Sequence, residues 1–211
     1  MNPEIDGLAV LAHEVRSPVA ALAAIADAYP AADAATRRRL LDLAGAAVAG
    51  LERLLGDAAP ASLRRVRFDA GRLAVDAAET ASLGGALVVV EAEEGLELDG
   101  DPDRLRQALD NLIANAVGHS PAGGTVTVTA RREGGSVVIA VADCGDGIAS
   151  DDLSRVFEPG VRCTATRPGS GIGLAVVRAI AEAHGGEVEV TSSPGQGATF
   201  RLVLPGASGA G

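Results

Sequence analysis

The period of the hydrophobic pattern changes near residue 60, and this change limits the folds open to the chain. In the first part, apolar residues recur at alternating steps of four and three, as in the seam of a coiled coil. The segment from Gly56 to Leu63 is a break that contains Pro60. In the second part, apolar runs of strand length alternate with helical segments. We therefore expect two domains, 1–60 and 61–211.

The first domain is predicted to be an antiparallel hairpin of two helices. Pro30 ends the first helix, and Asp33 is a candidate N-cap of the second. The seam residues of the first helix are Leu8, Ala12, Val15, Val19, Leu22, Ala26 and Tyr29. Those of the second helix are Leu40, Ala44, Ala47, Leu51 and Leu54. Because one hairpin leaves part of this seam exposed, we expect two copies to pair into a four-helix bundle, so that the protein is a homodimer.

The second domain is predicted to be an α+β sandwich. Asp101-Pro102 is a favourable helix start, and Gly185-Gly186 is a favourable helix end. The expected helices cover 70–82, 102–117 and 171–184. The expected strands cover 65–68, 86–92, 125–132, 136–143, 187–192 and 198–204.

Composition narrows the classes of partner and compartment. The formal net charge is −10, which argues against nucleic acid or an anionic membrane as the main partner. No apolar run approaches the ~20 residues of a membrane span, so we expect no membrane segment in this chain. The two cysteines are too few for a disulfide scaffold. We therefore expect a cytoplasmic setting, in which a membrane sensor outside this chain could still tether it.

His13 lies in the segment His-Glu-Val-Arg-Ser-Pro of the first helix. It follows the seam residue Ala12, so its ring should point outward, and Ser17 shares that face. Pro18 should kink the helix beside it. A neutral imidazole is a good nucleophile, and Glu14 can orient it and accept its proton. An ordinary exposed histidine beside a glutamate fits the pair as well, and only the strained proline favours a function.

Asn111 and Asn115 lie four residues apart on one predicted helix, among apolar neighbours. Amide oxygens on one helix face can ligate Mg²⁺ that phosphates also hold. Two surface asparagines are the plain alternative, but asparagine is a mediocre helix former. The pair is therefore a candidate metal site.

Two glycine-rich segments are candidate nucleotide sites. The segment 143–148 follows a buried strand, where Asp143 could accept the amine of adenine and glycines would let the base approach the backbone. The segment 169–174 opens a helix whose backbone amides suit phosphates. Each motif alone is weak, because the first also fits a tight turn. The second is neither a Walker loop nor a good dinucleotide fingerprint.

Together and in this order, the motifs resemble those of the bacterial sensor histidine kinases, over nearly the whole chain from about residue 7 to 205. Residues 13–18 resemble the phosphoacceptor box, and 111–116 resemble the asparagine box. Residues 143–148 and 169–174 resemble the two glycine boxes, and Phe157-Glu158-Pro159 resembles the phenylalanine box before the ATP lid. Five ordered motifs are far more specific than any one of them.

The resemblance implies a GHKL-type α/β sandwich and a histidine kinase of a two-component system, with ATP and Mg²⁺ as cofactors. It makes His13 the phosphorylated residue, Glu14 its acid–base partner and Ser17 a residue for reverse dephosphorylation of the partner. Mg²⁺ would be held by Asn115, helped by Asn111. The nucleotide pocket would comprise Asn111, Asn115, His119, Asp143, Gly145, Gly147, Gly169, Gly171, Gly173 and Leu174. The phosphoryl group would pass to an aspartate in the receiver domain of a response regulator.

One departure from the family pattern keeps other functions open. Gly118 stands where the family often has a basic residue, so a phosphate contact is missing unless Arg162 or Arg167 supplies it. A catalytically weak, ATP-binding signalling scaffold is therefore an alternative. An ATPase of the chaperone or serine-kinase kind is another, but it leaves the hairpin with His13 unexplained.

Four further side chains have open interpretations. His119 fits a contact with the nucleotide and structural packing equally well. Cys144 and Cys163 fall near the expected pocket, where ordinary cysteines are favoured over redox control because the pair has no redox spacing. His184 is most simply a helix C-terminal residue favoured by the helix dipole.

Overall fold

The structure is a computed structural model that describes residues 18–33, 36–37, 40, 43–44, 47, 63–158, 161 and 173–207. The chain divides into two compact units, Met1–Ser62 and Leu63–Gly211. Across these described stretches, no helix is both long and apolar enough to cross a membrane.

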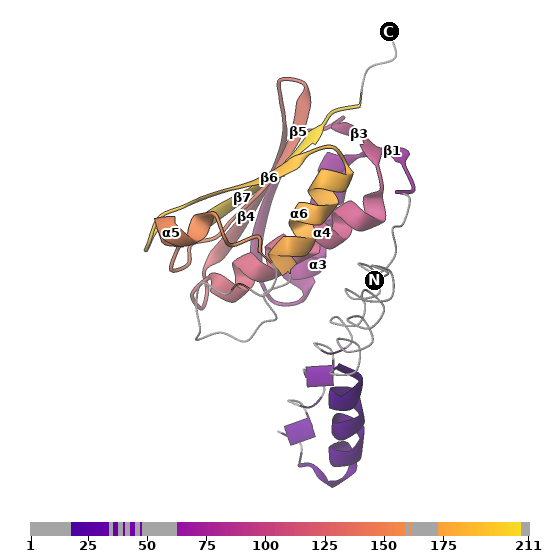
Figure 1. Ribbon diagram of the computed structural model, residues 1–211, viewed down its shortest axis with the longest axis vertical. Helices are drawn as coiled ribbons and strands as arrows, with labels where there is room; N and C mark the ends of the chain where they lie inside the picture. The colour runs from indigo at the N-terminus through magenta and orange to yellow at the C-terminus, as the bar shows by residue number, and fades with distance from the viewer. Residues whose placement is uncertain are drawn as a thin grey trace, which may run out of the picture. The chain divides into compact units, whose positions relative to one another are not determined.

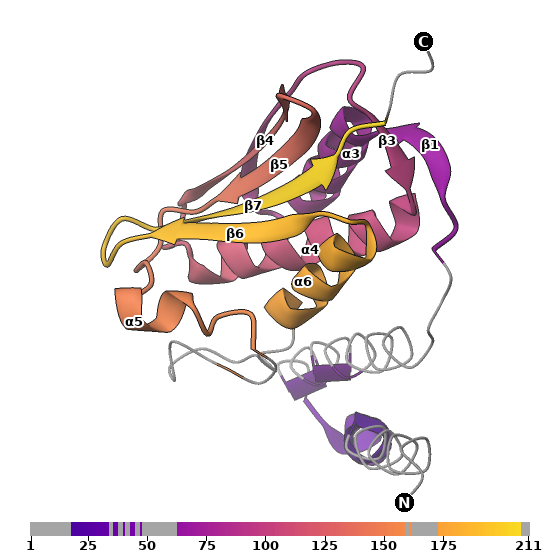
Figure 2. The same cartoon turned by 45° about the horizontal axis from the view of Figure 1, so that its top comes forward.

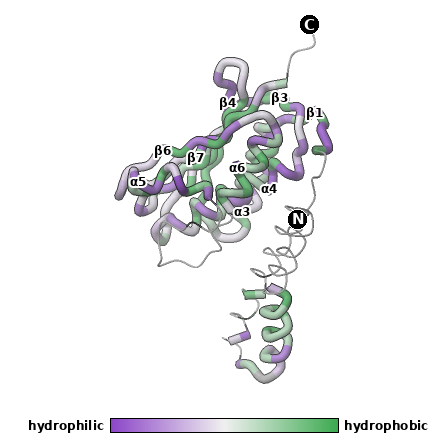
Figure 3. The backbone as a smooth tube through the Cα atoms, in the orientation of Figure 1, coloured by the Kyte–Doolittle hydropathy of each residue, from purple (hydrophilic) through white to green (hydrophobic). Residues whose placement is uncertain are grey.

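The described part of the first unit is a helix followed by a capped turn. Residues 18–28 are α-helical and mostly hydrophobic (Figure 3), and they continue into the 3₁₀ turn η1, Tyr29–Ala31. The Asp33 carboxylate accepts a hydrogen bond from the Thr36 amide at 2.8 Å, which confirms the predicted cap. Arg37 donates to the carbonyls of Tyr29 and Pro30, and its guanidinium lies 5.5 Å from the Tyr29 ring centroid.

The second helix of the predicted hairpin is described only at residues 36, 37, 40, 43, 44 and 47, all of which are helical. The residues before Pro18, and with them the predicted kink, lie outside the described residues. The antiparallel hairpin as a whole therefore stays a prediction.

The second unit is built on a mixed five-stranded sheet in the order β2-β4-β5-β7-β6. Its strands are β2 Leu87–Ala92, β4 Thr125–Glu133, β5 Ser136–Ala142, β6 Glu187–Ser192 and β7 Ala198–Pro205. Strand β2 pairs with β4 in parallel, and the other neighbours are antiparallel. Two short antiparallel strands, β1 Val66–Asp69 and β3 Glu97–Gly100, form a separate ribbon.

Three helices cover one face of the five-stranded sheet (Figures 1 and 2). They are α3 Ala70–Leu83, α4 Pro102–His119 and α6 Gly173–Ala183. A single helical turn, α5 Ser150–Leu153, follows β5. Along β7, buried residues alternate with more exposed ones, which is typical of a sheet covered on one side. Leu109, Leu112, Ile139 and Phe200 are among the fully buried side chains of the resulting core.

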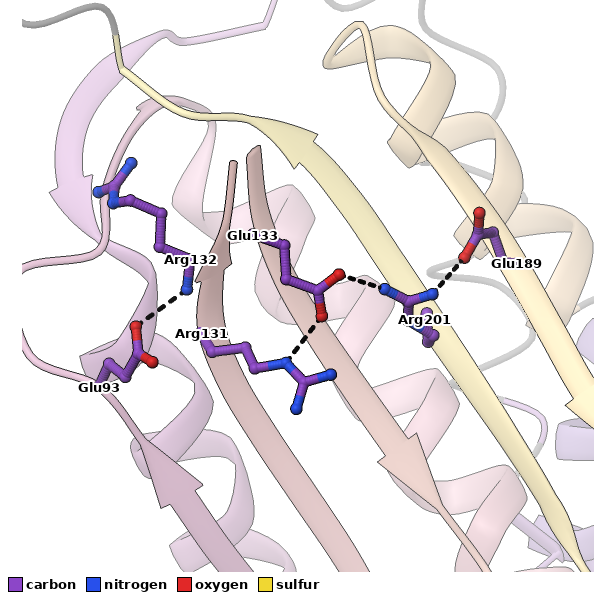
Figure 4. A network of polar contacts seen from close by, with 6 residues as sticks. All are labelled: Glu93, Arg131, Arg132, Glu133, Glu189 and Arg201. Atoms are coloured by element: carbon purple, nitrogen blue, oxygen red, sulfur yellow. Dashed lines mark hydrogen bonds and ion pairs between the residues drawn. The ribbon is translucent and has the colours of Figure 1, made fainter. Parts of the chain in front are cut away.

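The other face of the sheet carries polar and charged side chains. Arg201 on β7 donates to Glu133 at 2.7 Å and to Glu189 at 2.9 Å, and Arg131 also donates to Glu133 (Figure 4). The hydrogen bond from Arg131 is the main cause that lowers the pKa of Glu133. Because these groups are exposed to water, salt screens their attraction. The network therefore suits a solvated face.

The predicted α/β architecture of the second unit is confirmed. The observed helices and strands differ from the predicted ones mainly at their ends. Strand β3 was not predicted, because Glu97–Gly100 has only one apolar residue and no alternation. The cap of α3 was also not predicted: Asp69, the last residue of β1, accepts from the amides of Gly71 and Arg72. Helix α4 extends two residues past the predicted end, to His119.

Candidate nucleotide site

Helix α4 is the element that connects the predicted site motifs. It begins as predicted: Asp101 accepts from the amides of Asp103 and Arg104, and Pro102 occupies the first helical position. One side of the helix is buried in the core through Leu105, Ala108, Leu109, Leu112, Ile113 and Ala116. Because that side is fixed by packing, Asn111 and Asn115 lie at its half-buried border.

The middle of α4 meets the start of α6 at Asn111. A Cβ atom built on Gly173 would lie 3.8 Å from Asn111 Oδ1. The Nδ2 atom of Asn111 is buried and has no hydrogen-bond partner among the described residues. A buried polar group without a partner costs about 1–3 kcal/mol, so such groups are rare unless a ligand or water satisfies them. The Asn111 Nδ2 atom is therefore a candidate contact for a ligand or a water.

Asp143 follows β5 and is held by backbone amides. Its Oδ1 atom accepts from the amide of Gly145 at 2.8 Å and from that of Ala198 at 3.2 Å. Its own amide donates to the Ala198 carbonyl at 2.9 Å. These bonds fix the carboxylate and use one oxygen, while Oδ2 makes no hydrogen bond within the described part of the chain. A fixed carboxylate with one oxygen left can accept a directed hydrogen bond from a ligand amine.

Gly145 and Gly147 are required by close approach of the protein backbone. A Cβ on Gly145 would overlap the carbonyl oxygen of His119, so the last turn of α4 lies against this loop. Gly147 has a φ of +72°, and a Cβ there would overlap the carbonyl oxygen of Ser193. We predicted these glycines for the approach of a base. The described contacts are with protein, and the contact with a nucleotide stays a prediction.

Two residues of this site, Ser192 and Gly197, were not predicted from the sequence. Ser192, the last residue of β6, accepts from the Ile148 amide at 2.8 Å and donates to the Gly197 carbonyl at 2.6 Å. The Gly197 amide donates to the Gly145 carbonyl at 3.0 Å. The Gly-Gln-Gly turn between the last two strands was a visible signal of a tight turn. Nothing in its spacing indicated a contact with a loop about fifty residues earlier.

Comparison with known proteins identifies the second unit. The profile of the histidine kinase-, DNA gyrase B-, and HSP90-like ATPases matches residues 100–208. The chain belongs to this family. The matched segment contains every described residue of the candidate site, from α4 to the turn before β7.

Curated relatives of the chain include sensor histidine kinases, and the likeness to SenX3 extends beyond this segment. The sensor-like histidine kinase SenX3 of Mycolicibacterium smegmatis is 35% identical over 95% of this chain and 57% of its own length. The sensor histidine kinase ZraS of Escherichia coli is 47% identical over 52% of this chain and 23% of its own length. The chain spans about half the length of the SenX3 relatives that it matches.

Solved structures with the same fold include a sensor histidine kinase. Full-length ShkA in complex with AMPPNP has a TM-score of 0.73 at 30% identity, over 100% of this chain and 47% of that one. The mycobacterial sensor histidine kinase MprB has a TM-score of 0.61 at 28% identity, over 67% of this chain and 97% of that one. The GHKL-type fold of the second unit is therefore confirmed.

Other predicted residues of this ATPase-family unit contribute to packing. Leu174 at the start of α6 packs against the hydrophobic core, as does Phe157. The ring of Phe157 meets that of Phe200 edge to face, with centroids 6.2 Å apart. Cys144 is exposed, and its Sγ atom lies 3.6 Å from the Thr125 carbonyl oxygen. His13, Glu14, Ser17, Cys163, Gly169 and Gly171 lie outside the described residues.

His184 has a structural role that differs from the one predicted. Its ring is 4% exposed, and Nε2 accepts from the Asp101 amide at 2.9 Å. Nδ1 lies 2.7 Å from the Ile180 carbonyl oxygen and therefore carries the proton. The ring thus connects the C-terminal end of α6 to the first turn of α4 as a neutral hydrogen-bonding group. A favourable charge at the helix dipole is not needed to explain it.

The pKa of the Asp101 carboxylate is lowered by hydrogen bonds where α6 meets the start of α4. Burial raises its pKa, but hydrogen bonds from the amides of Arg64, Arg104 and Asp103 lower it more. The net pKa of Asp101 lies below its usual value. The ionised form therefore stabilises the start of α4.

Proposed function

We propose that this chain is the kinase core of a sensor histidine kinase, which phosphorylates its own His13 with ATP and passes the phosphoryl group to an aspartate of a response regulator. The observation that carries the proposal is that the likeness to the sensor-like kinase SenX3 extends over 95% of the chain, beyond the ATPase-family segment 100–208. The site geometry supports the nucleotide part of the proposal.

Residues on α4 and on the two glycine-rich segments would contact different parts of the nucleotide. Asp143 would accept the exocyclic amine of adenine through Oδ2, because Oδ1 is engaged by backbone amides. The buried Asn111 amide lies beside the start of α6, where backbone amides favour phosphate oxygens. Gly169, Gly171 and Gly173 would shape that end of the pocket, and His119 would lie near the base. The crystal structure of ShkA contains AMPPNP, an analogue of a nucleoside triphosphate, and this is consistent with nucleotide binding at the proposed positions.

Asn115 and Asn111 would hold Mg²⁺. A half-turn of the Asn111 amide exchanges its nitrogen and oxygen, so the same buried position can offer an oxygen to a cation or a donor to a phosphate. Amide oxygens are suitable ligands for this hard cation, so the residues present fit the ion. When bound, Mg²⁺ would neutralise charge on the phosphates during transfer.

His13 would be the nucleophile of the first transfer. Its neutral ring nitrogen would form a bond to the γ-phosphorus while the bond to the bridging oxygen breaks and ADP leaves. Glu14 would orient the ring and accept its proton. The receiver aspartate would then take the phosphoryl group from the phosphohistidine. Ser17 would position a water for the reverse dephosphorylation of the regulator.

The first unit would be an antiparallel hairpin, 1–60, that pairs with a second copy to form a four-helix bundle, and the catalytic domain would cover 61–211. Val19, a residue of the predicted seam, is 49% exposed in the single chain. Exposed apolar residues on described helical segments are expected where a partner helix covers them.

A catalytically weak ATP-binding scaffold is the second candidate function, and Gly118 favours it. This position on α4 has no side chain, although the family often places a basic residue there. A scaffold would bind nucleotide through Asp143 and Asn111 and carry no phosphate on His13.

Incubation with γ-labelled ATP and Mg²⁺, for the wild type beside His13→Ala, tests the proposal. We expect label on the wild type that is lost in acid, is stable in base and is missing from the variant. Label that survives acid, or persists in the variant, would contradict histidine phosphorylation. Binding of ATP by both proteins without any label would favour the scaffold.

A further inference from the structure

We propose that Ser192 is a positioning residue for the recognition of adenine: its hydroxyl holds the loop 143–148 so that the second oxygen of Asp143 faces the base. This inference rests on the proposed function, in which Asp143 accepts the adenine amine. Ser192 itself would not touch the nucleotide.

The Ser192 hydroxyl joins two segments that are distant in the sequence. It accepts from the Ile148 amide at 2.8 Å, at the end of the loop that starts with Asp143. It donates to the Gly197 carbonyl at 2.6 Å, in the turn between β6 and β7. A hydroxyl has one proton to donate and lone pairs to accept, so a single side chain can serve both segments. An alanine at this position would leave the Ile148 amide and the Gly197 carbonyl without these partners.

The loop and the turn are interlocked along their whole contact. The Gly195 amide donates to the Asp146 carbonyl at 2.7 Å, and the Gly197 amide donates to the Gly145 carbonyl at 3.0 Å. Gly197 has a φ of +72°, and a Cβ there would overlap the Asp143 carbonyl oxygen. The turn therefore lies directly against the backbone that carries the recognising carboxylate.

Ser192 and Asp143 are the side chains that make hydrogen bonds in this contact, and they stand at its two ends. Asp143 is bonded to the Ala198 amide, just after the turn, and Ser192 is bonded to Ile148, just after the glycines. The bonds from the Gly195 and Gly197 amides are between backbone atoms. Removal of the Ser192 hydroxyl would free one end of the loop while the other end stays tied. Because the carboxylate accepts from the Gly145 amide within the same loop, greater freedom of that loop would reduce the fixed direction of the carboxylate.

Loss of direction should affect only ligands that use the Asp143 carboxylate. A hydrogen bond weakens steeply when its angle or length departs from the optimum. We therefore expect Ser192→Ala to weaken ATP binding by roughly three- to tenfold, the range of one net hydrogen bond. Purine riboside triphosphate, which lacks the 6-amino group, should bind the variant and the wild type about equally.

The experiment measures the affinity of the full chain for ATP and for purine riboside triphosphate by competition against a fluorescent nucleotide. The matched control is Ser193→Ala, because Ser193 is the exposed neighbour and enters the contact through its backbone carbonyl. Ser192→Thr keeps a hydroxyl and should restore the preference for ATP. Ser192→Cys has a weaker donor and acceptor and should give an intermediate preference for ATP over purine riboside triphosphate. If Ser192→Ala does not fold, this variant tests the inference in its place.

The outcomes separate this inference from the proposed function. A lower ATP preference in Ser192→Ala, with Ser193→Ala unchanged, supports the inference. Equal weakening of both ligands, or an unchanged preference, would assign Ser192 to stability alone and overturn it. A wild type that binds ATP no better than purine riboside triphosphate would contradict the adenine contact of Asp143, whereas the labelling of His13 tests the kinase function separately.

Discussion

The two ends of the candidate nucleotide site differ in how many of their hydrogen bonds the protein makes by itself. At the Asp143 end, one carboxylate oxygen, the glycine loop and the β6–β7 turn are already joined by side-chain and backbone bonds. At the Asn111 end, the buried Nδ2 atom has no hydrogen-bond partner among the described residues. The base would meet a preorganised acceptor, whereas the phosphates would complete an unsatisfied site. Affinity and specificity should therefore depend on the first end, and the stability of the empty protein should be lowered by the second.

Asp143→Asn should have the largest effect and would test the preorganised end. The amide keeps an oxygen for the amides of Gly145 and Ala198, but it directs an NH₂ group at the adenine amine, so two donors oppose each other. We expect ATP binding to weaken roughly 30- to 100-fold, about 2–3 kcal/mol, with little change in unfolding. Calorimetric titration with ATP measures it. Asp151→Asn, an exposed change on α5, is the charge-matched control, and equal weakening there would refute a specific contact.

Asn111→Leu tests the unsatisfied end, because it should make the nucleotide-free protein more stable and weaken its binding of nucleotide. Removing a buried amide without a partner should stabilise the nucleotide-free protein by about 1 kcal/mol. The thermal shift produced by ATP and Mg²⁺ should shrink at the same time. Urea unfolding without nucleotide and thermal unfolding with it measure the two effects. Gln107→Leu, one turn earlier on α4, should keep the full nucleotide shift. Destabilisation of the empty Asn111→Leu protein would show that the amide is satisfied after all.

Gly118→Lys tests whether the phosphate end lacks a cation. A Cβ at this position would meet no atom within 4 Å, so the helix accepts a side chain there. We expect ATP affinity to rise severalfold, by about 1 kcal/mol, because an ammonium near phosphates adds a charge-assisted hydrogen bond. Gly118→Ala separates this from helix propensity, since it should stabilise α4 by up to about 1 kcal/mol without changing ATP affinity. An equal gain in affinity for both variants would remove the case for a missing cation.

Asp101→Asn should have the smallest effect, because the start of α4 lies far along the helix from both ends of the site. Asparagine keeps the capping geometry but not the charge, so we expect a loss of about 0.5 kcal/mol at pH 7. The folded pKa lies below the unfolded value near 4. The carboxylate therefore stabilises the fold above about pH 4, and this contribution disappears as the pH falls through the folded pKa. Urea unfolding at pH 7 and pH 3 should show the two proteins converging in acid.

The sequence predicted the elements of the second unit well where local chemistry decides them. Asp101-Pro102 correctly predicted the start of α4. The Gly-Gly pair correctly predicted the end of α6, where Gly185 has a φ of +76°. Strand β3 was missed because its pairing with β1 compensates for a sequence with no strand pattern. Ser192 and His184 were missed or misinterpreted because their partners, Ile148 and Asp101, lie 44 and 83 residues away.

The family, the order of the motifs and the residue types available for chemistry follow from the amino-acid sequence, because they depend on local spacing and side-chain identity. The sequence also predicted that a carboxylate follows a buried strand and that two amides share a helix face. Three features became visible in the folded chain. One Asp143 oxygen is engaged by backbone amides, the buried Asn111 Nδ2 atom has no partner among the described residues, and a serine at the end of β6 bonds the glycine loop. Hydrogen bonds between segments distant in the chain have no local pattern, because folding alone brings their donors and acceptors within 3 Å or so of each other.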